Sequence, residues 1–500
     1  MTKMNHLISL VLGSFFLAGC ATGPNQKALN ESNNALRNGD VPTALTILEE
    51  ANKNKKEKDT PYYLNKGEIT KYLGIENLSE SSSSLLVADS VVQDWQTKAS
   101  INLAKNTGDF LNYFFASIGS NSAYEPKDYE KSLLSYNLAL NHILAGRWDL
   151  ASIEAKKMAE RETIINQLHE KSVAALDAKE NENRKNRVQS YSRIDNINGY
   201  PVNLINSPEI SGLKNAYQNA AAHYLAGYIF EQQKDAGMAA PGYRTALELK
   251  PNNGLFELSL GLLDKNIEIT RRGARSTSDV LVIVETGSIP RINSHKSNIP
   301  FNTPQGVKIV TFNLPVIENS SPVFNPGSVR LGSQNIILYQ AANLDVMARR
   351  QLKDDMPGYL LKASTQAITQ LVAQAAAQAA AAKNNNQGAG LLASLAVGMA
   401  LSVGSADVRQ WSTLPSSIFM GRATVTKGEN NFSIPTPSGN FTVPLQVGQD
   451  YQVVHVRLLG PRAVVSTMGN TGAMSNYKIS NRSVPFELSS SVLKDSYALQ

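Results

Sequence analysis

The chain has 500 residues and a formal net charge of +6, with 48 Lys and Arg against 42 Asp and Glu. Hydrophobic residues make up 42% of it and charged residues 18%, which is typical of a folded chain long enough for two to four domains. The positive excess is small, and no cluster of Lys and Arg is interleaved with aromatic residues. The composition therefore gives no support for nucleic-acid binding.

The first twenty residues predict a secretory signal of the lipoprotein type. A basic start precedes an apolar run over residues 7–17, which is shorter than the roughly 20 residues needed to cross a bilayer. The stretch closes with Leu17, Ala18, Gly19 and Cys20. This tetrapeptide resembles the lipobox of bacterial lipoproteins, and the resemblance implies that residues 1–19 are removed and that Cys20 carries the lipids. An ordinary signal peptide or a signal anchor is the alternative interpretation.

The predicted lipidation has consequences for chemistry and location. Two or three acyl chains on Cys20 anchor a protein firmly to a membrane. Cys20 is the only cysteine, so we expect no internal disulfide and no cysteine-based metal or redox chemistry. Ala21 follows it instead of aspartate. By resemblance to the sorting rule of enterobacterial lipoproteins, this favours the outer membrane, with the chain facing the periplasm, over the inner membrane.

Paired helices are predicted in the N-terminal half. The clearest pair, over residues 220–251, resembles a tetratricopeptide repeat, in which small residues let two helices cross closely and a proline ends the second. The residues that carry the pattern are Ala226, Gly227, Ala239, Tyr243, Ala246 and Pro251. Two further pairs are predicted over residues 132–158 and 25–51, where Gly146 and Gly39 each precede an alanine by five residues. In the former, Leu138, Ala139 and Ala151 are expected to face the partner helix.

These patterns predict a tetratricopeptide-like helical domain over residues 20–275. An insert at about 178–210 begins as a charged continuation of a helix and then changes to turn-rich sequence. A generic helical bundle is the alternative interpretation. Stacked helix pairs form a concave surface that holds a peptide or a partner helix and carries no catalytic machinery of its own.

After Arg275 the sequence becomes β-rich, so the predicted fold class is α+β with a β module over residues 276–500. About seven short strands are expected, in a sandwich in preference to a barrel. Their cores lie at residues 280–284, 307–312, 335–339, 419–425, 430–434, 441–445 and 451–458. Prolines such as Pro300 and Pro315 are expected to mark loops between them.

A helical hairpin is predicted to interrupt the β module over about 344–404. A long alanine-rich helix is followed by the polar turn 384–388, and residues 390–403 are apolar with small residues at every fourth position, among them Ser402. Such a stripe allows close helix packing. Burial against the sheet is favoured, because about 14 apolar residues are few for a membrane span. Membrane insertion and a homo-oligomer formed through residues 358–404 are the alternatives.

The sequence predicts no catalytic, cofactor-binding or metal-ligating residue. The five histidines after the signal lack metal-pair spacing, and no nucleophile elbow, phosphate loop or dinucleotide fingerprint is present. Scattered acidic residues leave a carboxylate pair for glycan cleavage open. The segment Asp407–Pro415 holds Arg409 and Trp411 and is interpreted as a packing junction, with a partner contact as the alternative. The turn Glu285–Pro290 is interpreted as purely architectural.

Taken together, the lipobox, the irregular repeats, Gly287 and Pro290 after a strand, and the Asp407–Pro415 segment resemble a family of uncharacterised bacterial outer-membrane lipoproteins. Members often accompany lipoproteins that activate peptidoglycan-synthesising penicillin-binding proteins, and the resemblance implies an envelope role without site residues. The leading hypothesis is a lipid-anchored periplasmic adaptor for protein partners, peptidoglycan-synthesis proteins among them. The alternatives are a structural, oligomeric part of an outer-membrane export or appendage complex and, last, a glycan-cleaving enzyme.

Overall fold

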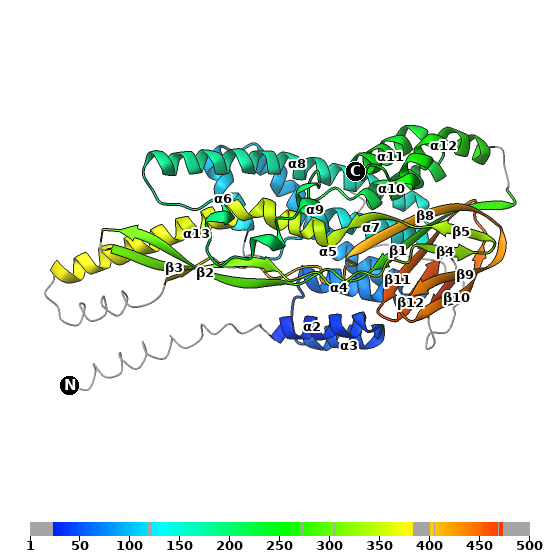
Figure 1. The fold of residues 1–500 in the computed structure, drawn as a ribbon, viewed down its shortest axis with the longest axis horizontal. Coiled ribbons are helices and arrows are strands. Elements are labelled where there is room, and N and C mark those ends of the chain that lie inside the picture. The colour runs from blue at the N-terminus through cyan, green and yellow to red at the C-terminus, as the bar shows by residue number, and fades with distance from the viewer. Residues whose placement is uncertain are drawn as a thin grey trace.

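The computed structural model describes residues 24–118, 123–271, 275–304, 306–383, 401–404, 406–468 and 470–473. Helices occupy the N-terminal half and mixed sheets the C-terminal half, so the predicted α+β class is confirmed (Figure 1). The predicted lipobox lies outside the described residues. None of the described helices is both long enough and apolar enough to cross a membrane.

The helices of the N-terminal half are joined by short turns with recognisable caps. They are α2 Pro24–Arg37, α3 Val41–Asn52, α4 Thr60–Lys71, α5 Leu78–Leu103, α6 Thr107–Ser117, α7 Asp128–Leu144, α8 Trp148–Lys185, α9 Pro208–Ser211, α10 Ala220–Gln232, α11 Ala236–Leu249 and α12 Gly254–Arg271. Asp40 caps α3 by accepting a hydrogen bond from the Thr43 amide at 3.2 Å. Gly39 and Gly146 end α2 and α7 with φ of +77° and +79°, which glycine adopts at little cost.

The three predicted helix pairs form as α2–α3, α7–α8 and α10–α11, and each pair packs side by side. In the last pair the helices approach so closely that a Cβ at Gly227 would lie 2.6 Å from the Tyr243 ring. Ala239 and Ala246 are fully buried beside it. The small residues at the crossing therefore allow the close approach of the two helices that the sequence pattern predicts. The tetratricopeptide-like nature of the helix pairs stays a prediction.

Helix α8 extends well into the predicted insert and ends at Lys185. The remainder of the insert crosses a β-hairpin, to which it is tied by hydrogen bonds. The Tyr200 hydroxyl donates to the Pro315 carbonyl at 2.7 Å, and the Tyr191 hydroxyl donates to the Pro300 carbonyl at 2.9 Å. The insert is thus part of the packed structure.

Thirteen strands are described, in three sheets, so the expectation of about seven is wrong. They are β1 Thr277–Thr286, β2 Ile292–Thr303, β3 Gly306–Ile317, β4 Ser328–Leu331, β5 Gln334–Ile337, β6 Tyr339–Asn343, β7 Leu401–Val403, β8 Ser417–Thr426, β9 Gly428–Thr436, β10 Gly439–Val447, β11 Tyr451–Leu459, β12 Arg462–Thr467 and β13 Asn470–Ala473. The six-stranded sheet has the order β13-β12-β11-β1-β8-β6, the four-stranded sheet β10-β9-β4-β5 and the three-stranded sheet β2-β3-β7.

The six-stranded and four-stranded sheets face each other over an apolar core. Val282 of β1 and Val456 of β11 meet Leu331, Phe432 and other side chains of the opposing sheet there. The other face of β1 is also buried, because Leu281 and its neighbours pack against helices. β1 therefore has both faces covered, which agrees with its nearly continuous apolar sequence.

Two of the prolines expected in loops lie within strands instead. Pro300 is in β2, the edge strand of its sheet, where a missing amide hydrogen costs no ladder bond on the open side. Pro315 is in β3, which pairs with β7 only over residues 310–312 and so lacks a second neighbour at Pro315. The prolines are tolerated because the hairpin is open at both places.

The predicted helical hairpin is wrong at its C-terminal end. Its first helix is α13, Leu344–Lys383, while residues 384–400 lie outside the described residues. Leu401–Val403 form β7, a strand that pairs in parallel with β3. Ser402 accordingly meets the Asn313 side chain at 2.8 Å and is not part of a helical stripe. Pairing with β3 across the fold outweighs the local helical pattern.

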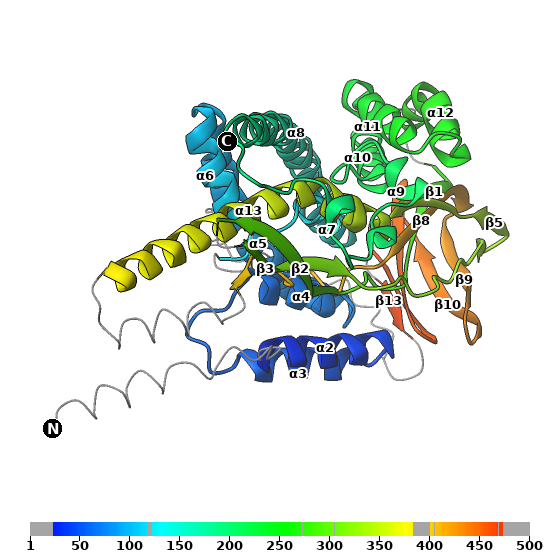
Figure 2. The same cartoon turned by 60° about the vertical axis from the view of Figure 1, so that its left-hand side comes forward.

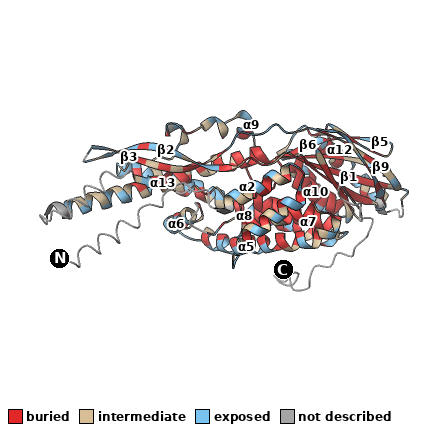
Figure 3. Cartoon of the chain, turned by 90° about the horizontal axis from the view of Figure 1, so that it is seen from below, coloured by how far each residue is buried: buried red, intermediate tan, exposed pale blue. Residues whose placement is uncertain are grey.

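Both halves of the chain share one apolar core. It joins side chains of α5, α7 and α10 with others of β1, β3 and α13. α13 crosses between the helices and the β2–β3 hairpin and then projects beside that hairpin (Figure 2). Buried residues gather where α7, α10 and β1 meet, whereas the far end of α13 is exposed (Figure 3). Sites made by both halves can therefore be rigid.

Candidate functional site

The candidate site is a cavity of about 110 Å³ where α13 meets the helical half. We call it the acidic pocket. Its walls come from α5, α6, α8, α13 and the segment before α7. Aromatic and acidic side chains dominate the lining, among them Trp95, Phe110, Tyr113, Phe114, Glu125, Asp128, Asp355, Tyr359 and Asp407.

The start of α7 is held in place by one buried carboxylate. Glu130 accepts a hydrogen bond from the Lys127 amide at 2.9 Å, which closes a capping arrangement at the helix N-terminus. It also accepts from the Trp411 amide at 2.8 Å and from the Tyr124 hydroxyl. Burial raises the pKa of Glu130. This carboxylate joins the Asp407–Pro415 segment to α7 and so fixes one side of the pocket.

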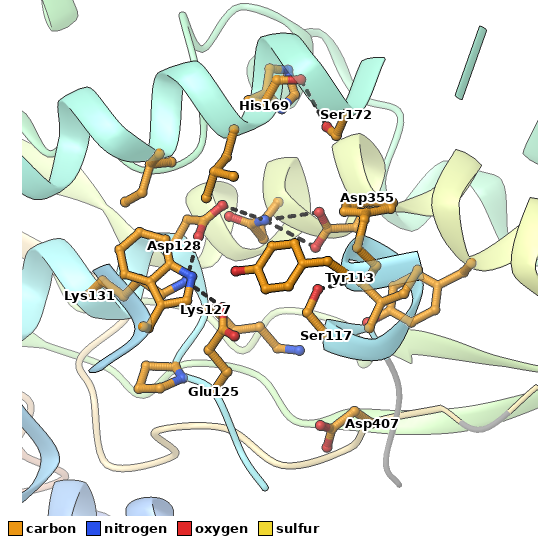
Figure 4. Close-up of a pocket in the computed structure, with 18 of the residues that line it drawn as sticks. Tyr113, Ser117, Glu125, Lys127, Asp128, Lys131, His169, Ser172, Asp355 and Asp407 are labelled. Atoms are coloured by element: carbon orange, nitrogen blue, oxygen red, sulfur yellow. Dashed lines mark hydrogen bonds and ion pairs between the residues drawn. The ribbon is translucent and has the colours of Figure 1, made fainter. Parts of the chain in front are cut away.

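Lys131 is neutralised at the back of the pocket. Its ammonium lies 3.0 Å from a Glu125 oxygen and 2.9 Å from an Asp128 oxygen, and Figure 4 shows it joined to both carboxylates. It also lies 3.9 Å from the centre of the Trp95 ring, a cation–π distance. The neighbouring carboxylates raise the pKa of Lys131 against the effect of burial. Lys131 is therefore a fixed cation with two partners already in place.

Asp355 faces the same space from α13 and forms no ion pair with the described residues, although the charge of Lys127 acts on it. Burial, followed by the nearby Asp128 carboxylate, raises its pKa to about 7. The Gln351 amide nitrogen donates to Asp128 at 3.4 Å and to Asp355 at 3.0 Å. The carbonyl oxygen of the same amide is buried and has no hydrogen-bond partner among the described residues. The pocket thus offers a protonatable carboxylate and an unused acceptor.

The residues predicted from repeat patterns lie elsewhere. Most are in the helical core, and Pro251 is exposed just after α11. The buried members are Leu138, Ala139, Ala151, Ala226, Gly227, Ala239, Tyr243 and Ala246. None of these lines the acidic pocket. Cys20 and the three residues before it lie outside the described residues.

The structure supports packing roles for Trp411 and for the histidines His142 and His223. Trp411 is fully buried, and Arg409 binds both oxygens of Asp407. His142 is buried and its pKa falls to about 3 because of that burial. His223 meets Glu162 at 2.8 Å. Among the described residues, no group of three or more His, Cys, Asp or Glu side chains could hold a metal ion.

Sequence reasoning missed the pocket because its lining comes from distant segments. Trp95 and Asp407 are both in the wall, and no spacing between neighbours indicates that. The one available signal is the polar stretch Glu125–Lys131, with five charged side chains around a helix start. Such a stretch is usually a solvated helix N-terminus, so it does not by itself indicate a site.

Comparison with known proteins gives no relative. No protein-family model and no curated protein matches the sequence, and no solved structure matches the fold.

Proposed function

We propose that this chain is a lipid-anchored periplasmic adaptor, held in the outer membrane through Cys20. It captures a protein partner by binding a basic side chain of that partner. The observation that carries the proposal is the acidic pocket. It has four carboxylates, those of Glu125, Asp128, Asp355 and Asp407, against the two ammonium groups of Lys127 and Lys131. Arg409 neutralises Asp407 from outside. A cation from a partner would complete the charge balance.

The chemistry of the lining supports a cation as the occupant. Aromatic faces attract ammonium and guanidinium groups, most strongly where water is excluded. The unpartnered Gln351 carbonyl accepts hydrogen bonds, which both cations donate and neither accepts. A cation beside Asp355 would also relieve its repulsion with Asp128 and lower its pKa from about 7.

The size of the pocket supports a side chain over a larger ligand. It encloses about 110 Å³, whereas an engineered cavity of about 150 Å³ admits benzene. The end of a lysine or arginine side chain fits such a space. Sites for drug-sized molecules are larger, roughly 300–1,000 Å³.

A second candidate, glycan cleavage, has one observation in its favour. Asp355 has a pKa of about 7 beside Asp128, and a protonated and an ionised carboxyl group are the pair that glycosidases use. The volume argues against a sugar ring as the occupant, so this function ranks second. Incubation with purified peptidoglycan tests it, because release of soluble muropeptides requires an enzyme.

The adaptor proposal is tested by crosslinked pull-down from intact membranes. Asp355→Lys places an ammonium of the chain itself in the pocket, so we expect loss of the partner that wild type recovers. The matched control is Glu182→Lys, because Glu182 is an exposed acid on α8 with 57% of its side chain accessible. Cys20→Ala tests the anchor separately. Equal recovery with Asp355→Lys and wild type, with both folded by circular dichroism, would refute capture by the pocket.

A further inference from the structure

A second cavity, of about 310 Å³, lies at the carboxyl ends of two parallel neighbours, β1 and β11. Thr286, Gly287 and Ser288 line it where β1 ends, and Gly460 lines it where β11 ends. Arg37, the last residue of α2, forms another side. The carboxyl ends of adjacent parallel strands are a common place for ligands in open sheets, because chain segments diverge there.

A fully buried arginine precedes Leu458 and Leu459, the two β11 residues that line this cavity, but does not line the cavity itself. Arg457 is 0% exposed, and none of its three guanidinium nitrogens has a hydrogen-bond partner among the described residues. The acid beside it in the sheet is Glu285, its register partner in β1. Glu285 already meets His455 at 3.1 Å and the Tyr72 hydroxyl at 3.3 Å. Burying a guanidinium without hydrogen-bond partners is costly, so Arg457 adds an incompletely balanced positive charge close to Arg37, which does line the cavity.

Arg37 lies close enough to Arg457 and to a third arginine, Arg291, to be affected by both charges. Burial, then the positive charges of Arg291 and Arg457, lower the pKa of Arg37, while Glu318 partly opposes them. The Nε atoms of Arg37 and Arg291 are buried without partners among the described residues. Their remaining contacts are single bonds, from Arg37 to the Ile289 carbonyl at 3.4 Å and from Arg291 to Asn34 at 3.0 Å. Three arginine side chains are thus held near one another, and each has a guanidinium nitrogen without a hydrogen-bond partner among the described residues.

The acidic side chains near the arginines do not fully balance the positive charge there, so an anion can bind. Glu285 and Glu318 are the acids next to the arginines, and Lys71 adds a positive charge close to Glu285. Lys71 is itself 2.9 Å from the buried Glu68. The Thr286 hydroxyl is another buried group with no partner among the described residues. Arginine forks match carboxylate and phosphate oxygens in pairs, which suits an oxyanion better than a halide.

We propose that this cavity is an anion site that binds a phosphate or carboxylate group through Arg37, with the Thr286 hydroxyl as a further donor. The positive charges of Arg291 and Arg457 near Arg37 strengthen the attraction. The anion takes up the free Nε donor of Arg37 and screens the repulsion among the arginines. The site is separate from the acidic pocket and shares no lining residue with it. The inference therefore does not rest on the proposed adaptor function.

Calorimetric titration of the full chain in nonionic detergent tests the proposal. The probes are inorganic phosphate, acetate and a short-chain phosphatidic acid. We expect wild type to bind at least one probe, and Arg37→Gln to bind it about tenfold or more weakly, because a charge-assisted pair is lost. Arg184→Gln is the control for charge, since Arg184 lies on α8 with 72% of its side chain exposed.

The probes also separate the sources of the anion. Binding of phosphate and phosphatidic acid but not acetate assigns a phosphoryl group, and tighter binding of the lipid assigns a headgroup. Acetate alone assigns a carboxylate. Arg457→Gln serves as a second variant and should weaken binding less than Arg37→Gln does, because Arg457 contributes only its charge. The proposal is overturned if wild type binds no probe, or if Arg37→Gln binds as tightly as Arg184→Gln.

Discussion

Replacing Arg422 by methionine should strongly destabilise the contact between the helical half and the six-stranded sheet. Arg422 is on β8, and its side chain is only 8% exposed. It lies 2.5 Å from Glu231 of α10 and 2.6 Å from Asp279 of β1, and its guanidinium carbon is 4.9 Å from the centre of the Tyr228 ring. Tyr243, Asp279 and Tyr224 raise the pKa of Arg422 despite burial, so it is charged at every accessible pH.

The magnitude follows from what the substitution leaves behind. Glu231 is 0% exposed and Asp279 12% exposed, so both carboxylates would remain in the interior without their cation. Removing one partner of such a buried pair costs about 3–5 kcal/mol. The loss should shrink as the pH falls. Without Arg422 the folded-state pKa values of both acids rise above their unfolded values, so the folded state binds more protons and gains stability in acid.

Urea unfolding followed by far-ultraviolet circular dichroism, at pH 7 and pH 5, measures both effects. Arg184→Met is the matched control, because that arginine is 72% exposed and 3.4 Å from Glu180. Exposed pairs of this kind contribute about 0–1 kcal/mol. A loss below about 1 kcal/mol for Arg422→Met, or a loss that grows in acid, would refute the assignment of Arg422 as a buried counterion.

Four further substitutions, one of them a control, test packing and the acidic pocket. Gly227→Ala should lower the stability by about 1–3 kcal/mol in thermal melting, because its Cβ would lie 2.6 Å from the Tyr243 ring. The control Gly261→Ala, with open space around the new atom, should be neutral or stabilising. Trp411→Ala should cost about 3–5 kcal/mol in the same assay, since the side chain is fully buried. Asp355 has a folded pKa of about 7, above the unfolded value of about 3.9, so wild type should lose stability between these values as pH rises. Asp355→Asn should remove that loss of stability. The expectation is contradicted if the melting temperatures of wild type and Asp355→Asn change in parallel from pH 4 to pH 8.

The elements that the sequence predicts well are those with strong local signals. Gly39 and Gly146 mark the turns of two helix pairs. β1 is recognisable because both its faces are buried, which leaves an unbroken apolar run. In each case a few neighbouring residues carry the information, so no knowledge of the rest of the fold is needed.

The elements that it predicts poorly depend on contacts between distant segments. β2 contains Asn, Ser, Lys and Pro and has an exposed outer side, so its sequence lacks strand character. It is a strand because it pairs along its whole length with β3. β7 likewise exists through β3 alone. The acidic pocket belongs to the same class, since Lys131, Asp355 and Trp95 come together only after the helices have packed.

The position of the acidic pocket links partner capture to the packing of α13. Lys362 of α13 donates hydrogen bonds to the carbonyls of Phe115 and Ile118 at the end of α6. Residues of α6 and α13 also form neighbouring walls of the pocket. A cation that binds only when both walls are in place adds its binding free energy to their contact. Occupancy by a partner should therefore slow amide exchange in α6 and in the first half of α13, while the far end of α13 exchanges as before.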